Sequence, residues 1–293
     1  MEKLNCEKVF CTLVDKTREY IQNNNLGAMV LGISGGIDST VVAAICHEVS
    51  KQTGIPLIGR SLPIKNKEDE FDVSKLVGEA FCSNFKIINL SLTTKSLVVE
   101  LKAEECAELT PIAEGNIQAR LRMMYLYNLA SIHKGLVMST DNQTEYQLGF
   151  WTIHGDVGDF DPLQDLWKTE VYGLAEWLSS YYKGALKNLD SVEEKLEYCK
   201  MYEAINESIG LTPTDGLGIS NSDLDQIGAK SYAEVDDILQ TMLLYKNPES
   251  EKWDILYNKY GEEIVNKVWN RHLASEFKRK NLPIVIERKE YDS

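Results

Sequence analysis

The sequence predicts an α/β fold built on a parallel β-sheet. Short runs rich in Val, Leu and Ile alternate along the chain with longer amphipathic stretches, a pattern typical of strands joined by crossover helices. Ligands bind such sheets at the carboxyl ends of the strands, so we expect a site in the segments that follow the apolar runs. The predicted strands are residues 28–33, 55–62, 84–90 and 135–140.

Helices are predicted between and beyond these strands. The first has apolar residues near helical spacing and ends at three consecutive asparagines. A polar helical insert is expected at about residues 183–208, within a single domain that spans residues 1–293, and its sequence indicates no role. The other predicted helices are residues 1–25, 38–49, 68–80, 115–133 and 169–180.

The stretch from Ala28 to Thr40, AMVLGISGGIDST, combines a buried strand, a tight glycine turn and a helix start. Its two loop glycines let the backbone approach a ligand closely. The free N–H groups at the helix start, with the positive end of the helix dipole, form an anion site. The hydroxyls of Ser34 and Ser39 can donate to phosphate, whereas Asp38 would repel phosphate unless a divalent metal lies between them.

This loop is neither of the two common nucleotide loops. The lysine of GxxxxGK[ST] is missing, and GxGxxG does not match. The string SGGIDS instead resembles the SGGxDS pyrophosphate loop of the N-type ATP pyrophosphatases, which split ATP between the α and β phosphates. That family includes amide-forming ligases and sulfur-inserting tRNA enzymes. For this string alone, an ordinary serine-glycine turn before a helix is the alternative.

Composition bounds the class of protein. The chain has 31 Lys and Arg against 45 Asp and Glu, and its formal net charge of −14 disfavours nucleic acid and anionic membranes as partners. No run approaches the ~20 apolar residues of a membrane span, and the charged N-terminus is not a signal peptide. The six cysteines lack CxxC spacing, so we expect reduced thiols in a cytoplasmic protein.

Several later motifs narrow the resemblance. From about residue 28 to 283, the chain closely resembles the ammonia-dependent NAD synthetase family. The motifs that carry this resemblance are GNIQARLRM from Gly115, STDNQTE from Ser139, GD.GD..P...L.KT.V..LA..L from Gly155, PTDGL from Pro213 and SEFKR from Ser275. The resemblance implies a doubly wound parallel sheet flanked by helices, of the adenine nucleotide alpha hydrolase-like class.

The resemblance also bears on the helix at 115–133, which is apolar almost all round from residue 121 to 132. Arg122 is the only charged residue of that part. Its pattern alone is compatible with a central core helix or with a subunit interface. The family resemblance implies that it packs a homodimer.

Site residues follow from the resemblance position by position. Asp38 and Glu145 match magnesium ligands; they follow two different strands, so they could converge on one Mg²⁺, which usually takes one or two protein carboxylates. Asp38 and Lys168 are the predicted catalytic residues. The residues that match ATP contacts are Gly32, Ile33, Ser34, Gly35, Gly36, Ile37, Asp38, Ser39, Thr140, Lys168 and Thr214. Those that match contacts with the dinucleotide substrate are Arg120, Asp159 and Lys278.

This sequence departs from the family pattern at three places, all in motifs that the resemblance assigns to binding of the dinucleotide substrate. Ile153 stands where the family usually has a lysine, and Phe277 replaces the histidine before the closing lysine. The family's GDGGAD motif is one residue shorter here, as GDVGD. ATP cleavage is therefore better supported than the identity of the acceptor acid. His154 could replace the lost lysine charge only if it is protonated.

The resemblance implies a Mg²⁺-dependent ligase that forms NAD from nicotinic acid adenine dinucleotide (deamido-NAD), ATP and ammonia. The substrate carboxylate attacks the α-phosphate, pyrophosphate leaves into the glycine loop, and ammonia displaces AMP, so catalysis would be positioning plus electrostatic stabilisation. The alternatives are a related ATPase that acts on another acid or on a tRNA, and a non-catalytic nucleotide-binding protein. A tRNA enzyme would want a basic surface and paired catalytic cysteines, which this chain lacks.

Free ammonia is the expected nitrogen donor. The 27 residues before the first matched motif are fewer than the ~50 that a domain needs, so they cannot form an added amidase domain. No cysteine shows a local amidase motif, and Cys46 lies within the helix after the glycine loop, where a buried thiol is expected. A separate glutaminase subunit would not be visible in this sequence.

Overall fold

A four-stranded parallel sheet lies at the centre of the protein, in a computed structural model that describes residues 4–64, 68–105, 108–212, 223–247 and 250–280. All three strand pairs are parallel, in the order β3-β2-β1-β4. The four predicted strands and the α/β class are confirmed. The strands are β1 (Met29–Gly32), β2 (Leu57–Ser61), β3 (Asn84–Ile87) and β4 (Leu136–Met138).

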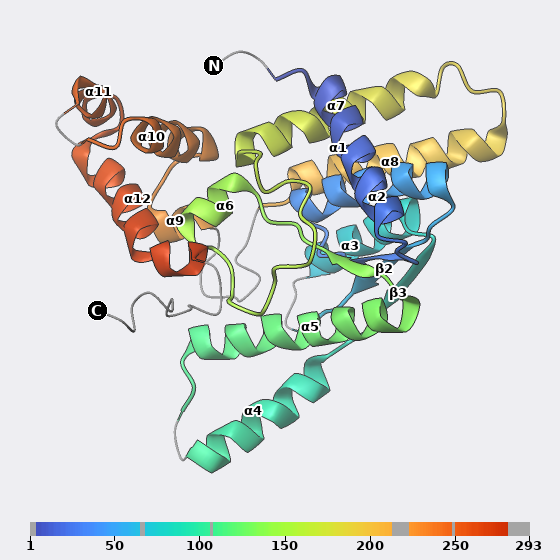
Figure 1. Cartoon of the computed structure of the whole chain (residues 1–293), viewed down its shortest axis with the longest axis horizontal. Helices are drawn as coiled ribbons and strands as arrows, with labels where there is room; N and C mark the ends of the chain where they lie inside the picture. The colour runs from blue at the N-terminus through green and yellow to red at the C-terminus, as the bar shows by residue number, and fades with distance from the viewer. Residues whose placement is uncertain (1–3, 65–67, 106–107, 213–222, 248–249, 281–293) are drawn as a thin grey trace, which may run out of the picture.

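Helices cover both faces of this sheet, as the doubly wound class requires (Figure 1). Side chains of β1 alternate between the faces: Met29 and Leu31 belong to one buried cluster, and Val30 belongs to the other. The second face packs on α5 (Pro111–His133), and α4 (Ser91–Glu105) lies outside α5. The helices of the first face are α1 (Cys6–Asn23), α2 (Ile37–Thr53), α3 (Glu68–Phe81), α7 (Lys168–Ala185) and α8 (Val192–Gly210).

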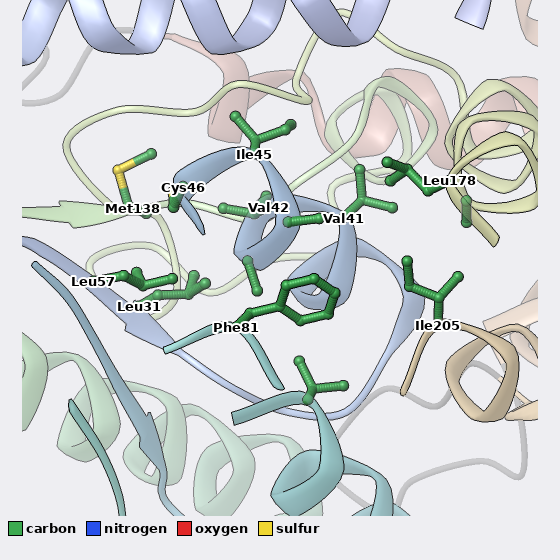
Figure 2. Packing of buried hydrophobic residues seen from close by; sticks show 14 of the residues in the cluster. Leu31, Val41, Val42, Ile45, Cys46, Leu57, Phe81, Met138, Leu178 and Ile205 are labelled. Atoms are coloured by element: carbon green, nitrogen blue, oxygen red, sulfur yellow. The ribbon is translucent and has the colours of Figure 1, made fainter. Parts of the chain in front are cut away.

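The larger core surrounds α2, which follows the glycine loop. Figure 2 shows Val41, Val42 and Ile45 of α2 among Leu31, Phe81 and the other side chains of this cluster. Cys46 has no exposed surface, and burial raises the pKa of its thiol far above the ordinary value. Such a thiol packs as a small apolar group and is not a nucleophile.

Helix α8 belongs to this core through Ile205 and contacts the start of α2. Thr40 and Ser208 are both buried, and their hydroxyl oxygens lie 2.7 Å apart. The helix that carries the glycine loop is therefore tied to α8 by a buried polar contact. Among the described residues, no helix combines the length and the apolar character that crossing a bilayer would require.

The C-terminal helices form a second body around Trp253, whose ring lies 5.4 Å from that of Trp269. Leu148 of α6 is part of the same buried cluster, so this body is fastened to the segment that follows β4. Figure 1 shows α10 to α12 together at one side of the molecule, beside α6. The elements are α6 (Gln143–Leu148), α9 (Asp223–Ile227), α10 (Tyr232–Leu244), α11 (Glu251–Tyr260), α12 (Glu262–Ala274) and the 3-10 turn η1 (Glu276–Arg279).

The sequence pattern did not indicate α4, α6 or α9 to α12, and α5 begins four residues before the predicted start. Thr110 caps α5 by accepting a hydrogen bond from the Ala113 amide, and Pro111 occupies the first turn, where its missing N–H costs nothing. The segment 213–217, which includes Thr214, lies outside the described residues.

Gly135 offers a test of the close packing between β1 and β4. A Cβ at this position would lie 2.3 Å from the Ala28 carbonyl oxygen, which is backbone and cannot rotate away. We expect Gly135→Ala to lower the free energy of unfolding by about 1–3 kcal/mol, measured by urea denaturation. Gly173→Ala is the matched control, because the added methyl meets nothing within 4 Å and alanine is favoured in a helix. Equal urea midpoints for the two variants would contradict the packing.

Candidate active site

A cavity of about 560 Å³ lies at the carboxyl edge of the sheet. Its wall includes the ends of β1, β2 and β4, one side of α5, the loop after α6, and side chains from α12 and η1. This is the edge at which parallel sheets bind ligands. The predicted site residues that line the cavity are Gly32, Ile33, Ser34, Asp38, Ser39, Thr140, Glu145 and Lys278.

The glycine loop after β1 has the form of an anion site. Gly35 adopts φ +90°, a conformation that side chains other than glycine rarely take. Gly36 precedes α2 and provides no side-chain cap, so the first amides of a 17-residue helix are left for another acceptor. The hydroxyl oxygens of Ser34 and Ser39 lie 3.0 Å apart across the loop, and Ser34 Oγ accepts from the Gly36 amide. Amides and hydroxyls thus converge where a phosphate would bind.

Lys168 joins the two predicted magnesium ligands. Its Nζ donates to Asp38 Oδ2 at 2.5 Å and to Glu145 Oε1 at 2.8 Å, although only 2% of the residue is exposed. Burial alone would lower the pKa of Lys168, but the carboxylates of Asp38 and Glu145 outweigh it and hold that pKa well above the ordinary value. The side chain therefore stays an ammonium ion, and its Nζ also lies 5.5 Å from the centre of the Tyr232 ring.

Four hydrogen bonds, two made by Asn142 and two made by Thr144, orient Asp38, α6 and Lys168 with respect to one another. Asn142 is fully buried; its Oδ1 accepts from the Glu145 amide and its Nδ2 donates to Asp38 Oδ1 at 2.8 Å. Thr144 Oγ1 accepts from the Lys168 amide and donates to Asp236 Oδ1 at 2.5 Å. The sequence motif contained Asn142 and Thr144 but assigned them no role. Asn142 could have been found as a helix N-cap, whereas Asp236 lies far along the chain and has no local signal.

The two carboxylates suit a magnesium ion. Asp38 and Glu145 both place an oxygen within 2.8 Å of one ammonium nitrogen, so both can approach a single cation. Mg²⁺ commonly takes one or two protein carboxylates and completes its shell with phosphate oxygens and water. Within the described ranges, no group of three or more His, Cys, Asp or Glu side chains forms a metal site. Two carboxylates match the number of protein ligands that Mg²⁺ commonly takes when phosphate oxygens complete its shell.

Three further carboxyl groups lie close enough to repel one another, and two of them, Asp141 and Asp156, line the cavity. Burial raises the pKa of Asp161 to about 7, and desolvation by the protein around the cavity raises that of Asp156, whose side chain opens into the cavity, to about 6. Asp141 is buried and accepts from Ser139 Oγ at 2.9 Å; burial, followed by repulsion from Asp156 and Asp161, raises its pKa well above the ordinary value. Asp156 and Asp161 can therefore hold or accept a proton near neutral pH.

The predicted dinucleotide contacts are not gathered in the cavity. Arg120 is exposed on α5, where its Nε and Nη2 donate to the Ile153 carbonyl at 3.3 Å. Asp159 accepts from Tyr127 and from the Val137 amide. The guanidinium group within the apolar helix that does line the cavity belongs to Arg122.

Lys278 reaches the cavity but donates to the backbone. Its Nζ donates to the Gly149 carbonyl at 2.6 Å and to the Trp151 carbonyl. Arg271 of α12 also lines the cavity, and its guanidinium carbon lies 3.8 Å from the centre of the Phe150 ring. The sequence did not single out Arg271. Helix α12 has several charged residues, and their spacing does not indicate which cationic side chain faces the cavity.

The chain is similar in sequence to NAD synthetases and in fold to an NMN synthetase. A family model described as NAD synthase matches residues 9–282. NH(3)-dependent NAD(+) synthetase from Pyrococcus furiosus is 33% identical over 285 residues, which cover 97% of this chain and 96% of that protein. Glutamine-dependent NAD(+) synthetase from Thermotoga maritima is 27% identical, over 93% of this chain and 48% of that protein, so the chain spans about half the length of this relative. NMN synthetase from Francisella tularensis resembles it in fold, with a TM-score of 0.74 at 23% identity, over 98% of this chain and 100% of that one.

Asp161→Asn should change how stability depends on pH. With a folded-state pKa of about 7, Asp161 keeps its proton over a range in which the unfolded chain releases it, from about pH 4 upward. Its contribution to stability is therefore present at low pH and falls as the pH rises to about 7, by about 1.4 kcal/mol for each pKa unit of difference. Asparagine keeps the acceptor for the Leu163 amide and carries no charge, so the variant should be the more stable protein at about pH 8.

Urea unfolding at about pH 4, 6 and 8 measures this effect. Asp165→Asn, exposed on the same loop, is the control and should follow the wild-type pH dependence. An Asp161→Asn variant with the wild-type slope between pH 4 and 7 would show that this carboxyl group does not carry the effect.

Proposed function

The chain belongs to the NAD synthase family, and we propose that it is an ammonia-dependent NAD synthetase, an ATP-dependent amide-forming ligase. The observation that carries this proposal is the convergence of Asp38, Glu145 and Lys168 beside an uncapped helix start. Such a site suits the departure of pyrophosphate from ATP, because it offers fixed donors and a metal position to the charge that develops there. The substrates are deamido-NAD, ATP and ammonia.

The first half of the reaction joins the substrate carboxylate to the α-phosphate. The amides that begin α2, together with the hydroxyls of Ser34 and Ser39, hold the leaving pyrophosphate. Lys168 is buried behind the cavity wall, where it holds Asp38 and Glu145, and its proposed contact with the ATP phosphates would be made from there; Thr140 lies on the cavity wall as a further contact for ATP. Asp38 and Glu145 would hold Mg²⁺, which when bound neutralises phosphate charge.

The second half replaces AMP by ammonia at the acyl carbon. Ammonia must lose a proton as the amide forms, and Asp156 lines the cavity with a pKa of about 6, suitable for a proton acceptor near neutral pH. No side-chain nucleophile is needed, because the adenylate itself activates the carboxyl group. Catalysis is then a matter of holding the reactants in line and stabilising the charge of the leaving groups.

A homodimer through α5 is part of the proposal. Three large apolar side chains of α5, Met124, Tyr127 and Ile132, are 65%, 39% and 64% exposed, and exposed apolar surface of this kind is typical of interaction sites. Arg120 and Asp159 lie on or beside this exposed side, so we place their predicted contact with the dinucleotide near the dimer interface. Thr214 and Lys278 keep their predicted roles at the phosphates and the dinucleotide.

The proposed setting is the cytoplasm. The cysteines in the described part of the chain, Cys6, Cys11, Cys46, Cys82 and Cys199, are all free thiols. Free thiols persist in reducing compartments. The acidic net charge gives no reason to invoke nucleic acid or an anionic membrane as a partner.

The decisive experiment incubates the purified chain with ATP, Mg²⁺, ammonium chloride and deamido-NAD and follows AMP and NAD by mass spectrometry. Asp38→Asn and Glu145→Gln are nearly isosteric, so the fold should persist while turnover falls on the order of 10²- to 10³-fold. AMP formation with another acid, such as nicotinic acid mononucleotide, but not with deamido-NAD would redirect the proposal to that acid. No AMP with any acid would favour a nucleotide-binding protein, and near-normal turnover of both variants at limiting Mg²⁺ would remove the metal site.

The same assay identifies the nitrogen donor. We expect turnover with ammonium and none with ammonia-free glutamine at matched concentration. Turnover with glutamine that is lost when the thiols are alkylated would reveal an amidase site in this chain.

The dimer can be tested by light scattering at micromolar concentration. Met124→Glu with Tyr127→Glu places two charges on the exposed side of α5 and should dissociate the dimer, because a desolvated charge without a partner is costly. Glu176→Lys, on the exposed side of α7, is a control that should leave the dimer intact. A wild-type chain with the mass of a monomer would contradict the interface.

A further inference from the structure

The carbonyl groups at the end of α6 are held by side chains from α12 and η1. We call these side chains, Arg271, His272, Ser275, Lys278 and Arg279, the C-terminal clasp. The Gln147 carbonyl accepts from Arg279 Nη1 at 2.7 Å and from Ser275 Oγ at 3.4 Å, and His272 Nδ1 lies 3.1 Å from it. One carbonyl at the end of a six-residue helix thus has three side-chain neighbours from a segment more than 120 residues away.

The next carbonyls are held in the same way. The Leu148 carbonyl accepts from Arg271 Nε at 3.1 Å. Lys278 Nζ donates to the carbonyls of Gly149 and Trp151. The last carbonyls of a helix lack partners within the helix and carry the negative end of its dipole, so cations are favoured there. Backbone amides of Gly149 and Phe150 bind the carbonyls of Tyr146 and Glu145, and the clasp supplies donors for the remaining two, those of Gln147 and Leu148.

The backbone is shaped for this contact. Gly149 ends α6 with φ +66°, and a Cβ at this position would lie 2.4 Å from Ser275 Cβ. Only glycine allows both the left-handed turn and the close approach of Ser275. Ser275 is itself buried and accepts from Arg279 Nη1 at 2.7 Å.

Helix α6 needs such support because it is too short to be stable alone. Isolated helices shorter than ~12 residues are marginal in water. Yet two contacts of the site depend on α6. Glu145, on this helix, accepts a hydrogen bond from Lys168, and the N-cap residue Asn142 donates one to Asp38. The position of Glu145 therefore depends on what fixes the two ends of α6: the sheet at one end and the clasp at the other.

We propose that Arg279 is a positioning residue that acts on Glu145 through the end of α6, an inference that rests on the proposed ligase site. Its guanidinium bridges two elements, with Nη1 on the Gln147 carbonyl and Nη2 on the His272 carbonyl at 2.5 Å. Arg279 does not line the cavity, unlike Lys278 and Arg271, so it is not placed to contact a substrate. Its part is to hold α6 against α12.

The test compares Arg279→Ala with Lys280→Ala in the full chain. Lys280 is the neighbouring residue and is exposed, with only a 3.7 Å ion pair to Glu276. Amide hydrogen exchange of residues 143–151 measures the hold on α6 without any substrate. AMP formation then gives kcat and the KM for deamido-NAD. Losses of about 10-fold are typical when a group supporting a metal ligand is removed.

We expect Arg279→Ala to raise exchange in residues 143–151 and to lower kcat, each by about 10-fold, with KM for deamido-NAD nearly unchanged and Lys280→Ala like wild type. Arg279→Lys keeps one donor and should recover part of both losses; it also serves if the alanine variant does not fold. Unchanged exchange at residues 143–151, or a raised KM with unchanged kcat, would overturn the positioning role. If the chain makes no NAD, the ligase proposal fails while the exchange measurement still decides whether Arg279 holds α6.

Discussion

The site depends on one buried ammonium ion shared by two carboxylates. Lys168 begins α7, Asp38 lies in the first turn of α2, and Glu145 lies on α6, so the ion pairs join three elements from separate parts of the chain. Transferring any one of these charges out of water alone would be prohibitive, and together they are tolerated because each compensates another. The ion pairs of Lys168 with Asp38 and Glu145 therefore fix the position of the glycine loop relative to α6.

The surroundings of Lys168 explain why such a charged cluster can be precise. Asn142 donates to Asp38, Thr144 accepts from the Lys168 amide, and Asp236 accepts from both Thr144 and the Thr169 amide. Hydrogen bonds between buried polar groups resist rearrangement, because each lost bond would leave a buried group unpaired. The carboxylates of Asp38 and Glu145 are thus held on one ammonium nitrogen, at 2.5 Å and 2.8 Å.

The parts of this site that could be predicted from the sequence are those whose signals are local. The loop from Ser34 to Ser39 is contiguous, and the strand before it is a single apolar run. The predicted run was two residues longer than β1, because Ala28 and Ile33 are buried although they lie beyond the strand. Apolar character indicates burial, whereas a strand ends where its hydrogen bonds end.

Other parts could not be predicted because they depend on distant contacts. Helix α6 is too short to show a periodicity, and its supports lie in α10, α12 and η1. Helix α5 is apolar almost all round, so its pattern does not fix its rotation. Two residues along a helix turn by about 200°, which is why Arg122 rather than Arg120 lines the cavity.

The span of the clasp has a consequence for how the protein is made. Arg279 and Gln147 are 132 residues apart, so their contact closes only after nearly the whole described chain is available. At about 5–20 residues per second, a ribosome leaves the sheet and α2 exposed for several seconds before η1 emerges. The core of the sheet can condense during this interval, whereas the end of α6 cannot be completed. Completion of the end of α6 is therefore a late step, and a nascent chain stalled before η1 would have a folded sheet core without the C-terminal clasp.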